Sequence, residues 1–182
     1  MGLAGNFCAA QLDKEPHEMT WTRPNRNTYK LNIDAAFHAN GSGAAGAILR
    51  DHKGSPLAGA CWPLDNLLDA ATAEALALQK DLTLIECIRC SPVIIETDSM
   101  ELCQSYNGVI EIWSPYSAIL VDCFVKAHSI GSVSVQHCRR EANVVAHNLA
   151  KHALETNSYT FWEDDPPRFI FADVMNDVSL FD

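Results

Sequence analysis

The hydrophobic pattern changes its period near residue 69, and this change narrows the available folds more than any other feature of the sequence. In KLNIDAAF (residues 30–37), apolar side chains alternate with Asn32, Asp34 and Ala36, which is the period of a strand with one apolar face. Two further strand-like segments, GSGAAGAILR and SPLAGACW, follow after short turns that contain glycine. Residues 29–64 therefore predict three antiparallel strands in a meander.

Beyond Asp69 the pattern is helical. DAATAEALALQKDLTLIE is rich in Ala and Leu and contains neither Gly nor Pro, and Asp69 is its predicted N-cap. An apolar stripe at helical spacing contains one acid, Glu74. The predicted solvent face of this helix consists of Thr72, Gln79, Thr83 and Glu86.

The rest of the core alternates strands with helices. PVIIETD is a strand that ends at Asp98, and SMELCQSYNG is a short helix stopped by Gly108. A longer helix follows, with Ser114 as its N-cap, Pro115 in its first turn and Gly131 at its end. SVSVQHC is a fifth strand, and EANVVAHNLAKHALE is the last helix.

This order predicts an α/β fold with a mixed five-stranded sheet and helices on both faces. The fourth and fifth strands should be parallel to the first, because strand–helix–strand connections join parallel strands by right-handed crossovers. We assign residues 29–157 to one domain, residues 1–28 to a linker or N-terminal arm, and residues 158–182 to an extended tail. The tail is expected to pack through Trp162, Phe169 and Phe171.

The charge of the chain limits the partners that it can bind. The 182 residues carry a net charge of −10, which opposes non-specific binding to nucleic acid but suits a site for divalent cations. The seven cysteines form no disulfide framework, and Cys87 and Cys90 lack a second pair at zinc spacing. We find no signal peptide and no apolar run of membrane length. We therefore expect an intracellular protein, nuclear or cytoplasmic, that does not bind membranes.

Three acids occupy positions where a strand or helix usually carries apolar side chains. Asp34 lies inside the first strand, Glu74 on the first helix and Asp98 at the end of the fourth strand. Each of them alone would usually be a solvated side chain. If the first and fourth strands are neighbours with the helix across them, the three carboxylates converge and repel one another unless Mg²⁺ or Mn²⁺ neutralises them. Two such ions about 4 Å apart can clamp a phosphoryl group during in-line displacement.

Four motifs resemble the ribonuclease H family: LNIDAAF…GSGAAGAILRDHKG, TAEALAL, ETDS and VQHCRREANVVAHNLA. They occur in the order and spacing of that family and cover residues 29–155. They look most like its plant branch, which is found in retrotransposon-derived reverse transcriptases and as standalone proteins. The resemblance implies a ribonuclease H-like fold and an endonuclease that hydrolyses the RNA strand of RNA–DNA hybrids with two Mg²⁺ or Mn²⁺ ions.

The resemblance also implies roles for individual residues. Asp34, Glu74 and Asp98 match the family's first three catalytic acids, which are also metal ligands. His137 matches its loop histidine, which assists product release. Contacts to nucleic acid are expected from Arg139, Arg140, Asn143, Asn40 and Ser99.

The last helix departs from the family pattern. Where the family reads A-D-x-L-A, this chain reads AHNLA at residues 146–150. His147 thus replaces the fourth carboxylate, and we expect it to act in catalysis and metal binding from the same position. Because imidazole suits Mn²⁺ better than Mg²⁺, this replacement predicts a weaker second metal position and a preference for Mn²⁺.

A second departure is electrostatic. Some family members grip the hybrid with a lysine-rich helix, whereas this chain has one cation, Lys126, between Ser99 and Gly131. Arg50 and Lys53 are further candidates for phosphate contact at the first hairpin. So few cations against a net charge of −10 predict weak, salt-sensitive binding of nucleic acid.

We therefore expect a divalent-metal endonuclease that acts on RNA–DNA hybrids and is weakened by His147. The alternative is a catalytically degenerate, domesticated domain of the same fold that binds a nucleic acid or a protein partner. The acidity and His147 favour this alternative, and the three retained acids favour the enzyme. Exonucleases and integrases of the same fold fit the TAEALAL and REAN stretches less well, and the pattern does not define the oligomeric state.

Overall fold

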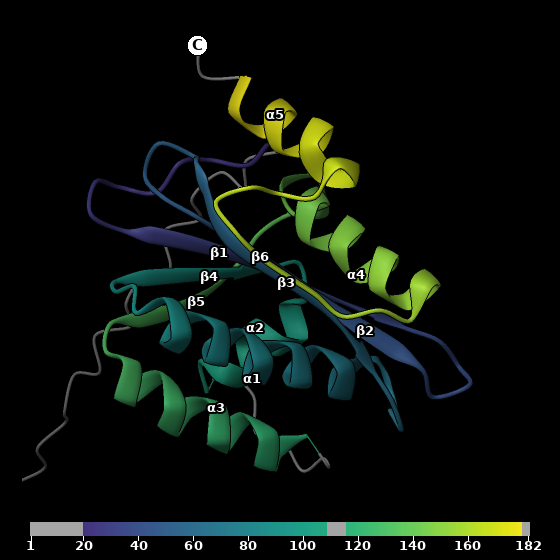
Figure 1. Cartoon of the computed structure of the whole chain (residues 1–182). Coiled ribbons are helices and arrows are strands. Elements are labelled where there is room, and N and C mark those ends of the chain that lie inside the picture. The colour runs from purple at the N-terminus through teal and green to yellow at the C-terminus, as the bar shows by residue number, and fades with distance from the viewer. Residues whose placement is uncertain (1–19, 109–115, 180–182) are drawn as a thin grey trace, which may run out of the picture.

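A mixed six-stranded sheet forms the centre of the protein (Figure 1), whose computed structural model describes residues 20–108 and 116–179. In the order β5-β4-β1-β2-β3-β6 across the sheet, β1, β2 and β3 form the predicted antiparallel meander. β4 is parallel to β1, and β5 is parallel to β4. The predicted fold class is confirmed, with one strand more than expected. The strands are β1 (Tyr29–Phe37), β2 (Gly43–Arg50), β3 (Pro56–Leu64), β4 (Val93–Thr97), β5 (Val133–His137) and β6 (Thr160–Glu163).

Helices cover both faces of the sheet, as predicted (Figure 1). One face carries α1 (Ala70–Ile88), α2 (Met100–Tyr106) and α3 (Ser117–Ile130), and the other carries α4 (Val144–Thr156) and α5 (Phe171–Ser179). Two short 3₁₀ helices, Arg140–Ala142 and Arg168–Ile170, precede α4 and α5. In the described part of the chain, no helix is long and apolar enough to cross a membrane.

β6 is the strand that the sequence pattern did not predict. It pairs antiparallel with β3, inside the segment that we expected to be an extended tail. Trp162 is buried as expected, whereas Phe169 and Phe171 remain 43% and 54% exposed. Ile170 and Val174 pack into the core below α4 instead. Phe169 still stacks on His152 of α4, with ring centres 3.9 Å apart, so this segment packs through two aromatic rings and aliphatic side chains.

α1 begins where the sequence predicts. The Asp69 carboxylate accepts a hydrogen bond from Thr72 N (2.7 Å), and this bond lowers the pKa of Asp69. Thr83 and Glu86 are exposed on the predicted solvent face. Thr72 is buried, so its assignment to that face is wrong. It adjoins Ala73, which packs in a buried cluster with the loop before α1.

The end of α3 also agrees with the sequence. Gly131 has a φ of 121°, and its N–H donates to the carbonyl of Ala127. A positive φ is easily adopted by glycine, so the helix stops there. Ser114 and Pro115 lie outside the described residues, so the predicted start of this helix is not described.

A glycine in β2 allows α4 to lie against the sheet at the level of Asp34. Gly46 is paired with Asp34 across the β1–β2 ladder. A Cβ at position 46 would collide with the backbone of α4, at Ala150 N and Ala146 O. Because α4 can approach this closely, the residue after Ala146, His147, comes within reach of Asp34.

Candidate active site

Three acidic side chains meet where β4 ends beside the middle of β1. β1 and β4 are adjacent and parallel, with Ile33 opposite Thr97, so the residues that follow, Asp34 and Asp98, are neighbours. Glu74 reaches them from the second turn of α1, and one oxygen of each carboxylate lies within 4.8 Å of the others. The three acids line a cavity of about 300 Å³ together with Ala35, Ala70, Ala71, Ser99, Glu101, Arg140 and His147.

The surroundings of these acids favour bound protons or a bound cation. Burial, together with Asp98, raises the pKa of Asp34 to about 8. Burial and the other two acids raise the pKa of Glu74 well above its usual value. Glu74 Oε2 is out of contact with solvent and has no hydrogen-bond partner within the described residues. Hard oxygen donors with such an orphaned atom fit a divalent cation such as Mg²⁺ or Mn²⁺.

His147 lies beside the acids, but both of its ring nitrogens have partners. Nδ1 lies 2.8 Å from Asp34 Oδ2, and Nε2 lies 3.3 Å from Arg140 Nη2. A guanidinium can only donate, so Nε2 accepts and the ring proton is on Nδ1, where it donates to Asp34. Burial and Arg140 lower the pKa of His147, which favours this neutral form. In this arrangement neither nitrogen has a lone pair available for a metal, so the role of His147 as a ligand stays a prediction that would require these contacts to change.

The other predicted residues are divided between the cavity and its surroundings. Ser99 and Arg140 line the cavity. His137 is the last residue of β5, within the predicted fifth strand, and it pairs with Thr97 at the end of β4. Arg139 is exposed next to Arg140, and Asn40 is exposed in the turn between β1 and β2. The cavity lining includes neither His137 nor Asn40.

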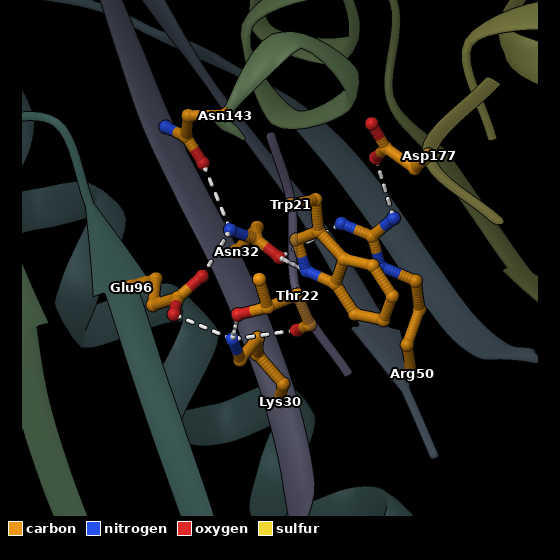
Figure 2. A network of polar contacts seen from close by, with 8 residues as sticks. All are labelled: Trp21, Thr22, Lys30, Asn32, Arg50, Glu96, Asn143 and Asp177. Carbon is orange, nitrogen blue, oxygen red and sulfur yellow. Dashed lines mark hydrogen bonds and ion pairs between the residues drawn. The ribbon is translucent and has the colours of Figure 1, made fainter. Parts of the chain in front are cut away.

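Asn143 belongs to a buried polar network (Figure 2). Its Oδ1 accepts a hydrogen bond from Asn32 Nδ2 (3.2 Å), and its Nδ2 donates to the carbonyl of Ile33 (2.8 Å). Asn143 is only 1% exposed, so its amide is satisfied inside the protein and the expected contact with nucleic acid does not fit this position. The carbonyl of Asn143 accepts from His147 N (3.0 Å), so this residue fixes the first turn of α4 against β1.

Arg50 is part of the same network, although the sequence placed it at the nucleic-acid surface. Its guanidinium lies 3.8 Å from the ring centre of Trp21, donates to Asn32 Oδ1 (2.8 Å) and pairs with Asp177 (2.7 Å). The residue is completely buried. The prediction that Arg50 contacts phosphate is therefore wrong, because a buried and paired guanidinium is not accessible to a phosphate in solvent. Lys53 remains exposed in the neighbouring turn.

Asn32 is the centre of this network, and sequence reasoning missed it. Figure 2 shows its side chain between Trp21, Glu96 and Asn143, with Oδ1 accepting from Trp21 Nε1 (2.8 Å) and Nδ2 donating to Glu96 (3.1 Å). Lys30 completes the network with an ion pair to Glu96 (2.6 Å). The alternation in β1 indicated one wet face, but a central strand between two helical layers is buried on both faces. The central position of this strand was the signal that could have revealed the network.

The strand order, the two helical layers and the three converging acids define a ribonuclease H-like domain. A family model described as "Reverse transcriptase-like" matches residues 32–153. Because the match covers more than half of the chain, the protein belongs to this ribonuclease H-like family, as its motifs indicated. No curated protein matches the chain.

Solved structures share this fold at low sequence identity. Ribonuclease H1 from Halobacterium salinarum is 21% identical, with a TM-score of 0.67, over 71% of this chain and 98% of that chain. LC11-RNase H1, isolated from compost, was solved in complex with an RNA/DNA hybrid; it is 20% identical, with a TM-score of 0.61, over 71% and 98% of the two chains. A foamy viral protease-reverse transcriptase is 17% identical, with a TM-score of 0.57, over 83% of this chain and 24% of that chain. At these identities the likeness establishes the fold.

Proposed function

We propose that the protein is a divalent-metal-dependent endonuclease that hydrolyses the RNA strand of RNA–DNA hybrids. The observation that carries this proposal is the meeting of Asp34, Glu74 and Asp98, with Glu74 Oε2 buried and without a partner in the described chain. Membership of the ribonuclease H-like family supports it, as does the complex of LC11-RNase H1 with an RNA/DNA hybrid.

In hydrolysis, the acids of this site would bind the metal ion and the arginines would bind phosphate. A bound divalent ion would supply Lewis-acid polarisation of a phosphoryl oxygen and a more acidic bound water. Asp34, Glu74 and Asp98 would hold the ion where β4 ends beside β1. Arg140, exposed at the rim of the cavity, would donate charge-assisted hydrogen bonds to phosphate oxygens. Arg139 is a further proposed contact, next to Arg140 in the chain.

A second candidate function is a binding module of the same fold without catalysis. The observation that favours it is the engagement of His147 by both Asp34 and Arg140, at the position where the family pattern has a carboxylate. Such a module would hold a nucleic acid through the rim arginines but would lack a complete set of metal ligands.

Cleavage of an end-labelled RNA–DNA hybrid, assayed with Mg²⁺ and with Mn²⁺, separates the two functions. We expect cuts in the RNA strand that leave 5′-phosphate and 3′-hydroxyl ends, and loss of these cuts in Asp98→Asn. Glu141→Gln, which removes an exposed acid outside the cavity, is the matched control. Binding of the hybrid without cleavage in either metal would favour the binding module. The preference for Mn²⁺ was predicted on the assumption that His147 binds the metal. Because both ring nitrogens of His147 have other partners, the assay has to compare both metals.

A further inference from the structure

We propose that the site holds one divalent ion instead of two, and that the Arg140 guanidinium, held by His147, supplies the second positive charge facing the phosphate. The role toward phosphate rests on the proposed nuclease function, whereas the number of ions depends only on the side chains of this chain. The proposal departs from the two-ion arrangement that the sequence motifs implied.

The available ligands are sufficient for one ion. Among the described residues, the group that could hold a metal consists of Asp34, Glu74 and Asp98, whose oxygens converge within 4.8 Å. Three converging carboxylates and water molecules can complete the octahedral coordination of Mg²⁺ or Mn²⁺. A second ion about 4 Å away would need further anionic ligands, and the side chain on the α4 side of Asp34 is an imidazole, which supplies no negative charge.

The imidazole of His147 cannot easily become a ligand for a second ion. Its Nδ1–H donates to Asp34 Oδ2, so this oxygen already faces a hydrogen-bond donor. Its Nε2 lone pair faces Arg140 Nη2 at 3.3 Å. A second ion would have to displace the guanidinium from Nε2, and while Arg140 remains in place the two cations would repel each other across a partly buried cavity. The observed contacts therefore favour a guanidinium over a metal ion at this position.

The backbone around Arg140 is anchored to the interior of the protein. The carbonyl of Arg140 accepts a hydrogen bond from Asn143 N (3.0 Å), and the Asn143 side chain is bonded to the carbonyl of Ile33 in β1. The turn that presents Arg140 is thus tied to the same strand as Asp34, while its side chain reaches the exposed rim of the cavity.

The guanidinium of Arg140 also has N–H donors that its contact with His147 does not use and that can bind a substrate phosphate. Its contact with His147 uses one of five N–H donors, and a guanidinium can bind a phosphate through two parallel hydrogen bonds. Arg140 can therefore contact His147 and a phosphate at the same time. This would place a fixed positive charge next to the phosphate without a second ion.

Counting the bound ions tests this proposal without any need for turnover. Metal-free protein is dialysed against Mn²⁺ and the ions bound per chain are counted, while calorimetric titration with Mn²⁺ gives the affinity of each site. Both measurements are made with the protein alone and with a 2′-O-methylated RNA–DNA hybrid that is not cut. The variants are Arg140→Lys, which keeps the charge, and a double variant, Arg140→Gln with His147→Asp, which replaces the cation and the imidazole by an amide and a carboxylate. Arg168→Gln, at an exposed arginine outside the cavity, is the matched control.

We expect one Mn²⁺ in the wild type, in Arg140→Lys and in Arg168→Gln. The double variant should bind two ions, the second at least about tenfold more tightly than any second ion in the wild type. Two ions of similar affinity in the wild type, one ion in the double variant, or no ion in the wild type would each overturn the proposal. Hydrolysis is measured separately, so that one bound ion without cleavage rejects the proposed nuclease but not the ion count.

Discussion

At the scale of single residues, Asp81 is the side chain that least suits its surroundings. It lies on α1, is completely buried, and neither of its carboxyl oxygens has a hydrogen-bond partner among the described residues. Burial raises the pKa of Asp81 well above its usual value, although Lys80 opposes this shift. A buried acid without a partner remains protonated in the folded state. It therefore lowers the stability of the fold at every pH at which the same acid would be ionised in the unfolded chain.

We expect Asp81→Ala to stabilise the protein at pH 8 by about 2–4 kcal/mol, and much less near pH 4. The raised pKa means that the folded state binds more protons than the unfolded state between about pH 4 and the folded pKa. The wild type therefore loses stability as pH rises through this range, and the variant lacks this loss. Urea unfolding from pH 4 to pH 8 measures the difference, with Asp122→Ala, at an exposed site on α3, as the matched control. A gain that does not change with pH would contradict this account of Asp81.

The raised pKa of Asp34 leads us to expect that metal binding depends on pH. Its carboxyl group has a pKa of about 8 in the metal-free protein, so a divalent ion must displace a proton at neutral pH. Affinity for Mn²⁺ should therefore increase as pH rises from 6 to about 8, by up to about tenfold per unit for each proton that the ion displaces from Asp34 and Glu74. Calorimetric titration at several pH values tests this, and Asp34→Asn should bind more weakly with a flatter pH dependence. A constant wild-type affinity from pH 6 to 8 would contradict the raised pKa.

At the scale of elements, α5 is joined to the centre of the sheet by one buried ion pair. Asp177 of α5 pairs with Arg50 of β2, and their side chains are only 13% and 1% exposed. Burial raises the pKa of Asp177 and lowers that of Arg50, and the attraction between the two charges opposes both shifts. Arg50 in turn donates to Asn32, so a helix near the end of the chain contributes to the network that holds α4 against β1.

We expect Asp177→Asn to lower the free energy of unfolding by about 3 kcal/mol, because the guanidinium of Arg50 would remain buried without an opposite charge. Glu155→Gln is the matched control, since Glu155 forms an exposed pair with Lys151 at 3.8 Å. Its effect should be at most about 0.5 kcal/mol. Urea unfolding of both variants makes the comparison. Equal, small effects would show that α5 adds little to the stability of the sheet.

At the scale of the whole molecule, the net charge of −10 opposes the binding of nucleic acid. The structure reduces the number of cations available for phosphate further, because Arg50 is buried. Lys30 is also buried, in an ion pair with Glu96. Arg139 and Arg140 remain exposed beside the cavity. Binding should therefore depend on few phosphate contacts.

We expect the affinity for an RNA–DNA hybrid to fall about tenfold between 50 and 200 mM salt, as for about two phosphate contacts. Asp98→Asn without divalent ions provides a form of the protein that should not cut the hybrid. A further Arg139→Gln substitution should reduce the slope of log affinity against log salt by about 1. Fluorescence anisotropy with a labelled hybrid measures these slopes. A slope of about 6 or more would indicate a cationic surface that these residues do not supply.

The sequence by itself determined the elements whose causes are local. The change from strand period to helix period near Asp69 located β1, β2, β3 and α1, since alternation and i, i+3/i+4 spacing depend only on neighbouring residues. The cap at Asp69 and the stop at Gly131 are local for the same reason. The alternation of strands and helices also predicted that β4 is parallel to β1. The three acids themselves could be identified from the motifs that resemble the ribonuclease H family.

Only the tertiary structure decided which side chains are buried and which partners they meet. Asn32 lies on β1, Arg50 on β2 and Asn143 just before α4, and their hydrogen bonds join residues up to 127 positions apart. Whether Arg50 meets a phosphate or Asp177 depends on the position of α5, which periodicity near Arg50 does not encode. The pairing of His147 with Asp34 and Arg140 likewise depends on the close approach of α4 at Gly46. Contacts between distant segments form only when the elements pack, so their chemistry is not contained in any local pattern.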